Sequence, residues 1–283
     1  MKRLILSLAI LATIFPSCSK LNDGDSFTAT SGGVQFRYEV IVSRMNFVRV
    51  SPAVNPSSLT GKVTIPSKVD YDGTTYAVTQ VASRAFEGAA LITAITLPSG
   101  LSVIEDHAFS GCSSLTEINT PQPLSVIGEY AFEGCANLES FNFEASLSEI
   151  GRGAFKGCAS LTSLNLTSSF TSIADETFFG CASLKSIELP ATIMQIGADA
   201  FGECRDLQDI VLDRSVQSIG AEAFAGNSNV KSITCMTPTP PSCGESAFDG
   251  IPVDISVIVP IASVTSYKEA SGWNRFLNYT GKY

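Results

Sequence analysis

Large apolar residues recur along the chain at a fixed interval, and short polar stretches separate them. A phenylalanine returns every 23 residues, and an aliphatic residue precedes it with the same period. The first column comprises Phe86, Phe109, Phe132, Phe155, Phe178, Phe201 and Phe224, and the second Val81, Ile104, Ile127, Ile150, Ile173, Ile196 and Ile219. No insertion or deletion interrupts the register from Val78 to Cys235. A period this strict predicts a repeat architecture.

Each 23-residue unit contains two short extended segments. In "LKSIEL", at 184–189, apolar and polar residues alternate as they do in a half-buried strand. The Leu-Pro that ends this segment turns the chain, and "IGADAF", at 196–201, returns its Ile and Phe to the same core. One unit cannot bury its own apolar face, so neighbouring units must stack. The sequence therefore predicts a solenoid of 23-residue coils, built mostly of short β-strands, over residues 78–250.

The segments that flank the repeats differ from them, as terminal coils must in order to shield the core. Residues 34–77 alternate as strands and contain Asp72-Gly73, a pair typical of a two-residue hairpin. We expect there a β-rich N-terminal cap with an incomplete first repeat. Residues 251–283 are expected to form a small C-terminal cap, in which Trp273 and Phe276 cover the last coil.

The first 17 residues have the pattern of an export signal. Lys2 and Arg3 precede the apolar run "LILSLAILATIF", which is shorter than a membrane-spanning helix needs. The run continues into "FPSC", which resembles a lipobox, and this resemblance implies cleavage before Cys18 and attachment of lipid to that residue. A plain secretory peptide that is cleaved nearby is the alternative. The small, polar residues after Cys18 predict a flexible tether over residues 18–33.

The repeating unit "LxxIxLPxxlxxIGxxAFxGCxs" resembles the BspA-type leucine-rich repeat of bacterial surface proteins, over about residues 61–250. The resemblance implies an α/β-solenoid-like leucine-rich repeat fold with right-handed coils. With the lipobox, it implies an exported lipoprotein anchored at the outer membrane or cell surface. Proteins of this type are associated with adhesion to host extracellular-matrix proteins and with coaggregation between bacteria. The implied partner is therefore an extracellular protein, either a host matrix protein or another bacterial surface protein.

The charge of the chain argues against a nucleic-acid partner. Lys and Arg number 18 against 27 Asp and Glu, which gives a net charge of −9. The sequence has no basic cluster that could replace the counterions of a phosphate backbone. Hydrophobic residues make up 45% of the chain and charged residues 16%, so there are enough apolar side chains to bury a core.

Cysteines raise the question of metal or redox chemistry, because five of the eight share one repeat position. They are Cys112, Cys135, Cys158, Cys181 and Cys204. Other units hold Ala89, Asn227 or Ile251 there, which indicates a small and mostly apolar site in the wall of the solenoid. A zinc site would require paired ligands such as C-x2-C or added histidines, and the sequence has neither, so we expect no metal. Disulfides between adjacent coils, and a bridge between Cys235 and Cys243, remain as alternatives.

The sequence contains no catalytic constellation. Its one histidine, His107, occupies a repeat position that also holds Arg84, Tyr130, Gly153 and Glu176. These residues share only a tolerance of water, so we interpret His107 as part of a variable exposed column. Carboxylates are scattered, and no Gly-rich phosphate loop stands between a strand and a helix. We therefore expect a protein that is not an enzyme and that uses no cofactor.

The outward positions of the first extended segment form a polar surface, which we call the strand face. Its candidate binding residues are Glu117, Asn119, Glu139, Asn142, Asn165, Lys185, Glu188 and Gln208. A repeated surface of this kind suits an extended partner. The sequence thus favours a lipid-anchored cell-surface binding protein, an adhesin that uses the strand face. The alternatives are a glycan-binding accessory lipoprotein of the outer membrane, against which the lack of aromatic residues on this face counts, and a structural envelope protein with a solvated strand face.

Overall fold

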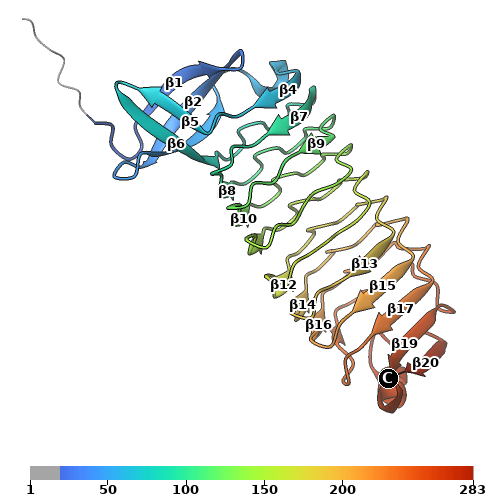
Figure 1. The fold of residues 1–283 in the computed structure, drawn as a ribbon. Helices are drawn as coiled ribbons and strands as arrows, with labels where there is room; N and C mark the ends of the chain where they lie inside the picture. Colours follow the sequence, from blue (N-terminus) through green and yellow to red (C-terminus); the bar gives the residue numbers. More distant parts are fainter. Residues whose placement is uncertain (1–19, 283) are drawn as a thin grey trace, which may run out of the picture.

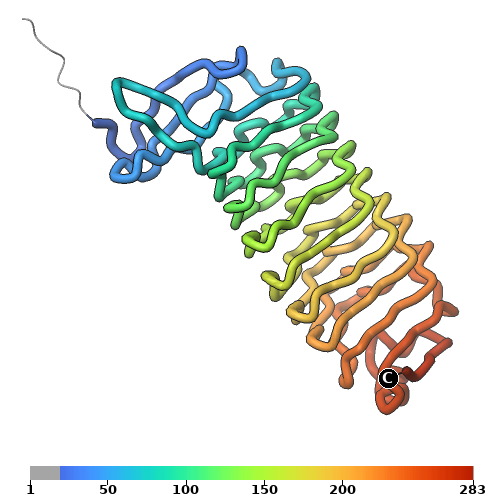
Figure 2. The backbone as a smooth tube through the Cα atoms, in the orientation of Figure 1, coloured from blue at the N-terminus to red at the C-terminus, as the bar shows by residue number. Residues whose placement is uncertain are grey.

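In the computed structural model, which describes residues 20–282, the phenylalanine column becomes a continuous stack of rings along the core. From Phe86 to Phe248, neighbouring ring centroids lie 5.2–5.7 Å apart and the ring planes differ by 8–15°. Every ring is buried. Equivalent residues therefore stack directly on one another. The backbone forms a row of stacked coils (Figures 1 and 2), and the predicted leucine-rich repeat solenoid is confirmed.

Each regular coil contributes one short strand to each of two sides of the solenoid. The strand-face side consists of β4 (Gly61–Thr64), β7 (Ile92–Thr96), β9 (Glu117–Ile118), β13 (Ser186–Glu188), β15 (Asp209–Leu212), β17 (Ser232–Cys235), β19 (Ser256–Pro260) and β20 (Asn278–Lys282). The second side consists of β6 (Thr74–Val81), β8 (Val103–Ile104), β10 (Val126–Ile127), β11 (Glu149–Ile150), β12 (Ser172–Ile173), β14 (Gln195–Ile196), β16 (Ser218–Ile219) and β18 (Ser242–Cys243). Partners pair in parallel and in the register of the repeat, as Ile196 with Ile219.

The sheets on both sides are interrupted near the middle of the solenoid. On the strand face, β9 ends one sheet and β13 begins the next, and on the second side β11 and β12 belong to different sheets. The interruption coincides with two extra buried aromatic residues, Phe141 and Phe143, whose ring centroids lie 4.9 and 5.5 Å from that of Phe155. Stacking of the coils continues across it through backbone hydrogen bonds outside the strands, such as those from Thr162 N to Glu139 O, of 3.3 Å, and from Phe155 N to Thr177 O, of 2.9 Å.

The N-terminal cap begins earlier than the sequence indicated. Strand β1 (Ser26–Ser31) pairs antiparallel with β2 (Val34–Val42), so the prediction of a tether over residues 18–33 is wrong from Ser26 onward. Phe27 explains the error, because its ring is buried against the rings of Tyr38, Tyr71 and Tyr76, with centroids 4.3–5.4 Å apart. A single aromatic residue with three aromatic neighbours orders an otherwise polar segment.

The rest of the cap has the predicted strands and hairpin. Strand β2 pairs antiparallel with β3 (Phe47–Pro52), and β5 (Lys68–Tyr71) pairs with β6 across the turn at Asp72 and Gly73, both with positive φ. Such a turn matches the twist of a two-stranded hairpin. Strand β6 then pairs in parallel with β3 and with β8, so it carries the sheet of the cap directly into the solenoid.

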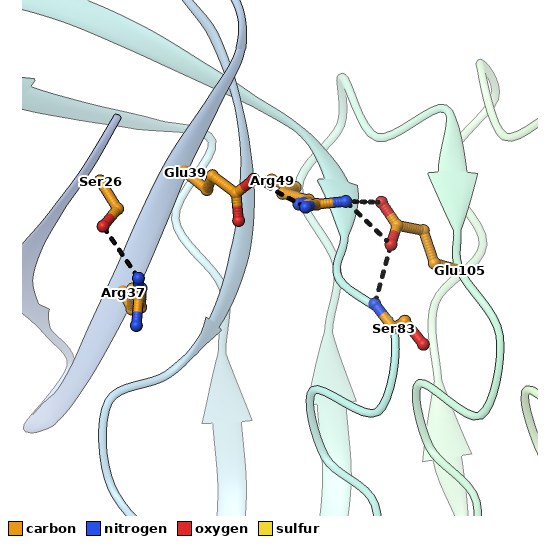
Figure 3. A network of polar contacts seen from close by, with 6 residues as sticks. All are labelled: Ser26, Arg37, Glu39, Arg49, Ser83 and Glu105. Carbon is orange, nitrogen blue, oxygen red and sulfur yellow. Dashed lines mark hydrogen bonds and ion pairs between the residues drawn. The ribbon is translucent and has the colours of Figure 1, made fainter. Parts of the chain in front are cut away.

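A polar network joins the cap to the first coils (Figure 3). Arg49 of β3 donates to Glu39 of β2 at 2.7 Å and to Glu105 of the solenoid at 3.3 Å. Glu105 also accepts a hydrogen bond from Ser83 N at 2.9 Å. Because the three charged side chains are at most about one-third exposed, the contacts are shielded better than those of a surface pair.

The C-terminal segment closes the stack and at the same time extends the sheet. Trp273 and Phe276 are buried against the last ring, with centroids 5.0 and 5.5 Å from that of Phe248, as predicted for a cap. Strands β19 and β20 add two more parallel strands beside β17. Between them lie the 3-10 turn η2 (Ile261–Ser263) and α1 (Val264–Glu269), the one α-helix of the described residues. A second 3-10 turn, η1 (Pro56–Ser58), precedes β4.

Candidate functional site

The structure brings the eight candidate residues to one side of the solenoid. All lie on or directly beside β9, β13 and β15, or on the equivalent segments of the two interrupted coils. Seven are exposed and Gln208 is half-buried. Neighbouring coils place them side by side, since Gln208 N donates to Lys185 O at 2.9 Å. The alternation of apolar and polar residues therefore predicted correctly that these side chains face outward.

Three of the candidate side chains are engaged within the protein. Asn119 bridges to the preceding coil, since its Oδ1 accepts from Leu97 N at 2.6 Å and its Nδ2 donates to Leu97 O at 3.0 Å. Asn142 donates to Glu144 at 2.5 Å, and Gln208 accepts from Lys231 at 2.7 Å. Asn119 thus has a structural role, because both halves of its amide are already used.

The other five candidates have no such engagement. The side chains of Glu117, Glu139, Asn165, Lys185 and Glu188 make no hydrogen bond or ion pair with any residue between 20 and 282. They carry one positive and three negative charges and one amide. A partner can therefore use their full hydrogen-bonding capacity without first breaking contacts inside the protein.

Two shallow cavities lie on the strand face, one at β9 and one at β13. The first has a volume of about 360 Å³ and is lined by residues that include Lys62, Glu117 and Asn119. The second, also of about 360 Å³, is lined by residues that include Asn165 and Glu188. Polar groups that converge on a concave surface can fix the orientation of a bound partner.

A third cavity, which the repeat pattern did not predict, lies near the C-terminal end of this side. It has a volume of about 300 Å³ and is lined by Arg214, Met236, Pro238 and Pro260, so that its wall is mostly apolar. The signal for it was the segment "MTPTPP", at 236–241, which departs from the repeat pattern. Methionine adapts its shape readily to apolar groups, and Arg214 adds one positive charge.

The cysteine column lies in the core, as predicted. Cys112, Cys135, Cys158, Cys181 and Cys204 are all buried, and all seven cysteines between residues 20 and 282 are free thiols. Cys235 Sγ lies 3.2 Å from the hydroxyl oxygen of Tyr267, which donates to it. Burial raises the pKa of the Cys204 thiol to about 12, and it raises that of Cys158 as well. Thiols held in the protonated form are poor nucleophiles and metal ligands.

The column also has a polar role that the sequence analysis did not predict. Each of the five thiols donates to the carbonyl oxygen of a phenylalanine in the preceding coil, at 3.2–3.4 Å. In the next coil Asn227 occupies the same position, and its Nδ2 donates to Phe201 O at 2.9 Å. Asn227 was the signal for this role, because a buried amide requires hydrogen-bond partners.

The column of His107 requires a correction. Its residues share a backbone conformation, since Arg84, His107, Tyr130, Gly153 and Glu176 all have φ between 53° and 59°. The interpretation that they share only tolerance of water is therefore wrong. The ring of His107 stacks on that of Tyr130, with centroids 5.2 Å apart. Tyr130 in turn lies over Gly153, where an added Cβ would meet the ring at 2.3 Å. His107 thus packs in a surface ladder.

Residues 20–282 contain neither a cluster of metal-ligating side chains nor a membrane-spanning helix. No group of three or more His, Cys, Asp or Glu residues there is arranged to hold a metal ion. No helix in that part of the chain is both long and apolar enough to cross a bilayer. Cys18 and the signal segment 1–17 lie outside the described residues.

Comparisons with known proteins agree with this architecture. The family model described as "BspA type leucine rich repeat region (6 copies)" matches residues 79–207 and, in an overlapping alignment, residues 148–271. Together these alignments span well over half of the chain. No curated protein matches the sequence.

Several solved structures share the fold. A leucine-rich repeat protein of T. pallidum is 24% identical, with 79% of this chain and 90% of that chain covered and a TM-score of 0.53. A leucine-rich cell surface protein of Faecalibacterium prausnitzii is 19% identical, with coverages of 90% and 95% and a TM-score of 0.53. A leucine-rich repeat protein of Bacteroides ovatus is 22% identical, with coverages of 93% and 76% and a TM-score of 0.51. At these identities the likeness shows the fold alone, whereas the family match rests on the repeats themselves. This chain belongs to the BspA-type leucine-rich repeat family.

Proposed function

We propose that the protein is a cell-surface binding protein, an adhesin whose strand face recognises an extended extracellular protein. The observation that carries the proposal is the set of five exposed polar side chains on this face that have no partner within residues 20–282. They extend over several stacked coils, which is the geometry of a long, shallow contact. Proteins of the host matrix and other bacterial surface proteins have the extended surfaces that such a contact requires.

Anchoring by lipid on Cys18 is the second part of the proposal, and it would place the solenoid at the outer membrane or cell surface. Its support is the lipobox-like "FPSC" after the apolar segment of the signal. Residues 20–25 precede the first strand and separate Cys18 from the cap. An adhesin must be held at the surface while its binding face remains accessible, and an N-terminal lipid satisfies both requirements.

Solid-phase binding of the purified chain tests the first part. The immobilised panel would hold fibronectin, fibrinogen, laminin, collagen, mucin and representative bacterial polysaccharides. We expect saturable binding to a protein of the panel, and loss of that binding when Lys185, Glu188 and Gln208 are changed together to alanine. The matched control changes Lys68, Glu149 and Gln195 to alanine, because these exposed residues have the same types and lie off the strand face.

Each outcome separates the candidate functions. Protein binding that both triple variants retain would place the contact elsewhere and contradict the proposal. Binding to polysaccharides alone would favour a glycan-binding lipoprotein, although the strand face lacks the exposed aromatic residues that sugars prefer. Circular dichroism of both variants must match that of the parent chain, so that a lost contact is not mistaken for lost folding.

A further inference from the structure

The turns that lead to the phenylalanine column donate a regular row of backbone hydrogen bonds to the next coil. In the penultimate turn, Glu222 N donates to Glu245 O at 2.9 Å, and Phe224 N donates to Ala247 O at 2.8 Å. Earlier coils repeat this pattern, as Arg84 N does toward Asp106 O at 3.0 Å. These N–H groups therefore point along the solenoid toward its C-terminal end.

The row ends without acceptors in the last turn of this kind. Ser246 and Phe248 are the equivalents of Glu222 and Phe224, yet their N–H groups have no acceptor among residues 20–282. The chain that follows forms α1 and then a turn over residues 271–275, and neither offers an acceptor to these two N–H groups. A backbone N–H that is withdrawn from water without an acceptor is energetically unfavourable, because it loses its hydrogen bond to water and gains none in return. Phe248 is 1% exposed, so its N–H meets this condition unless a bound group supplies an acceptor.

A cavity of about 460 Å³ lies beside these two N–H groups, between the last coil and the C-terminal cap. Ser246 and Phe248 line it from the last coil, and Ser271, Gly272 and Arg275 line it from the C-terminal cap. Ser246 has φ 54°, the left-handed conformation found in backbone concavities that bind anions.

Arg275 adds a third unpaired donor to this lining. Its Nη1 donates to Asp249 at 2.8 Å and its Nη2 to Ile251 O at 3.3 Å. Its Nε is buried and has no partner in the described part of the chain. The residues that line the cavity therefore carry two backbone N–H groups and one guanidinium N–H that lack an acceptor within residues 20–282.

We propose that this cavity is a binding site for an oxyanion, namely a carboxylate, sulfate or phosphate group. Such a group supplies several acceptor oxygens at once, and hydrogen bonds to an anion are about twice as strong as neutral ones. Two acidic residues line the same cavity. Asp249 is paired with Arg275, while Glu245 is exposed at the rim and opposes an incoming anion. The site lies apart from the strand face and is independent of the proposed adhesin function.

Titration of the isotopically labelled chain with single anions tests the proposal. The probes are acetate, sulfate and inorganic phosphate, with chloride at matched ionic strength as the reference, and the readout is the amide resonances of Ser246 and Phe248. We expect saturable shifts of these two amides with at least one probe. Saturation by acetate alone would identify a carboxylate source, and saturation by sulfate or phosphate would identify an ester or a free anion. Absence of saturable shifts with all three probes would overturn the proposal.

Variants connect those shifts to the cavity. Arg275→Gln should weaken binding at least about tenfold, since a hydrogen bond to a charged group contributes about 1.5–3 kcal/mol. Arg205→Gln is the matched control, because Arg205 is an exposed arginine outside the cavity and should leave binding unchanged.

Arg275→Gln also removes the ion pair with Asp249 and could destabilise the C-terminal cap, so two further variants test the site without this change. Ser271→Asp, at an exposed residue of the lining, should abolish binding by placing a carboxylate in the cavity, whereas Glu245→Gln should strengthen it severalfold. Binding that is indifferent to all of these changes would show that the anion sits elsewhere.

Discussion

The thiol of Cys158 donates a hydrogen bond of 3.3 Å to the carbonyl oxygen of Phe132 in the preceding coil. That carbonyl oxygen also accepts from Cys135 N at 3.1 Å, so it keeps a partner if the thiol is removed. The cysteine column thus combines apolar packing with a weak link between coils. The phenylalanine column, by contrast, supplies large apolar surfaces that nothing else can replace.

The two columns therefore predict different losses of stability. Cys158→Ala should lower the free energy of unfolding by about 1 kcal/mol, through one weak hydrogen bond and a small cavity. Phe155→Ala should lower it by about 3–5 kcal/mol, because the ring is fully buried and stacks on Phe132 and Phe178. Urea denaturation followed by circular dichroism measures both values. A larger loss for the thiol than for the ring would refute this division of roles.

Alkaline pH should destabilise the fold through its buried thiols. Burial raises the pKa of Cys204 from 9.0 to about 12, so between these values the unfolded chain loses a proton that the folded chain retains. The contribution of the buried thiol to the free energy of unfolding is present in full below pH 9. It falls as the pH rises, by up to about 1.4 kcal/mol per pH unit for each such thiol. Urea midpoints at increasing pH measure the slope. Cys204→Ala should make that slope shallower, and an unchanged slope would show that Cys204 ionises equally in both states.

The left-handed backbone conformation at Glu222 leads us to predict that glycine is more stable than glutamate at this position. Glu222 has φ 54° and an exposed side chain with no partner among residues 20–282, so Glu222→Gly should stabilise the chain. The left-handed conformation is unfavourable by about 1–2 kcal/mol for a residue with a Cβ, and the greater freedom of unfolded glycine offsets about half of this. The expected net gain is about 0.5–1 kcal/mol, measured as a rise in the urea midpoint.

Gly220 provides the contrast within the same turn. Its φ is not positive, but an added Cβ would lie 2.4 Å from Ala198 N in the preceding coil. Gly220→Ala should therefore destabilise by about 1–3 kcal/mol, because backbone atoms of a stacked coil cannot move aside without strain. If Glu222→Gly also destabilised, the left-handed conformation at this column would not be the source of strain that we infer.

The solenoid could be predicted from the sequence because every coil has the same environment. Seven copies of one pattern therefore indicate that one local structure is repeated seven times. Phe27, which lies outside the repeats, could not be assigned to the cap in this way. Its neighbours Tyr38, Tyr71 and Tyr76 come from strands later in the chain, and a polar segment with one aromatic residue gives no local sign of that contact. Non-local packing therefore decided the start of the cap.

The candidate surface was predictable in orientation but not in chemistry. Alternation along a strand decides which side chains face outward, and it placed Glu117 and Asn119 correctly on one face. Whether an outward side chain is available to a partner depends on whether it can reach backbone groups of the neighbouring coil and form hydrogen bonds with them. Asn119 meets both polar groups of Leu97, whereas Glu117 meets none within residues 20–282, and no pattern within the repeat distinguishes these two outcomes.

Lipid anchoring makes the last prediction. If Cys18 is acylated after cleavage, the chain should sediment with the membrane fraction, and Cys18→Ser should release it or leave the precursor uncleaved. Several acyl chains on one residue hold a protein firmly, whereas a plain secretory peptide leaves no anchor. Cell fractionation with mass spectrometry of the N-terminal peptide measures both location and modification. Cys112→Ser is the matched thiol control, and it should remain with the membrane. A soluble parent chain, or a Cys18→Ser variant that stays bound to the membrane, would contradict an anchor at this residue.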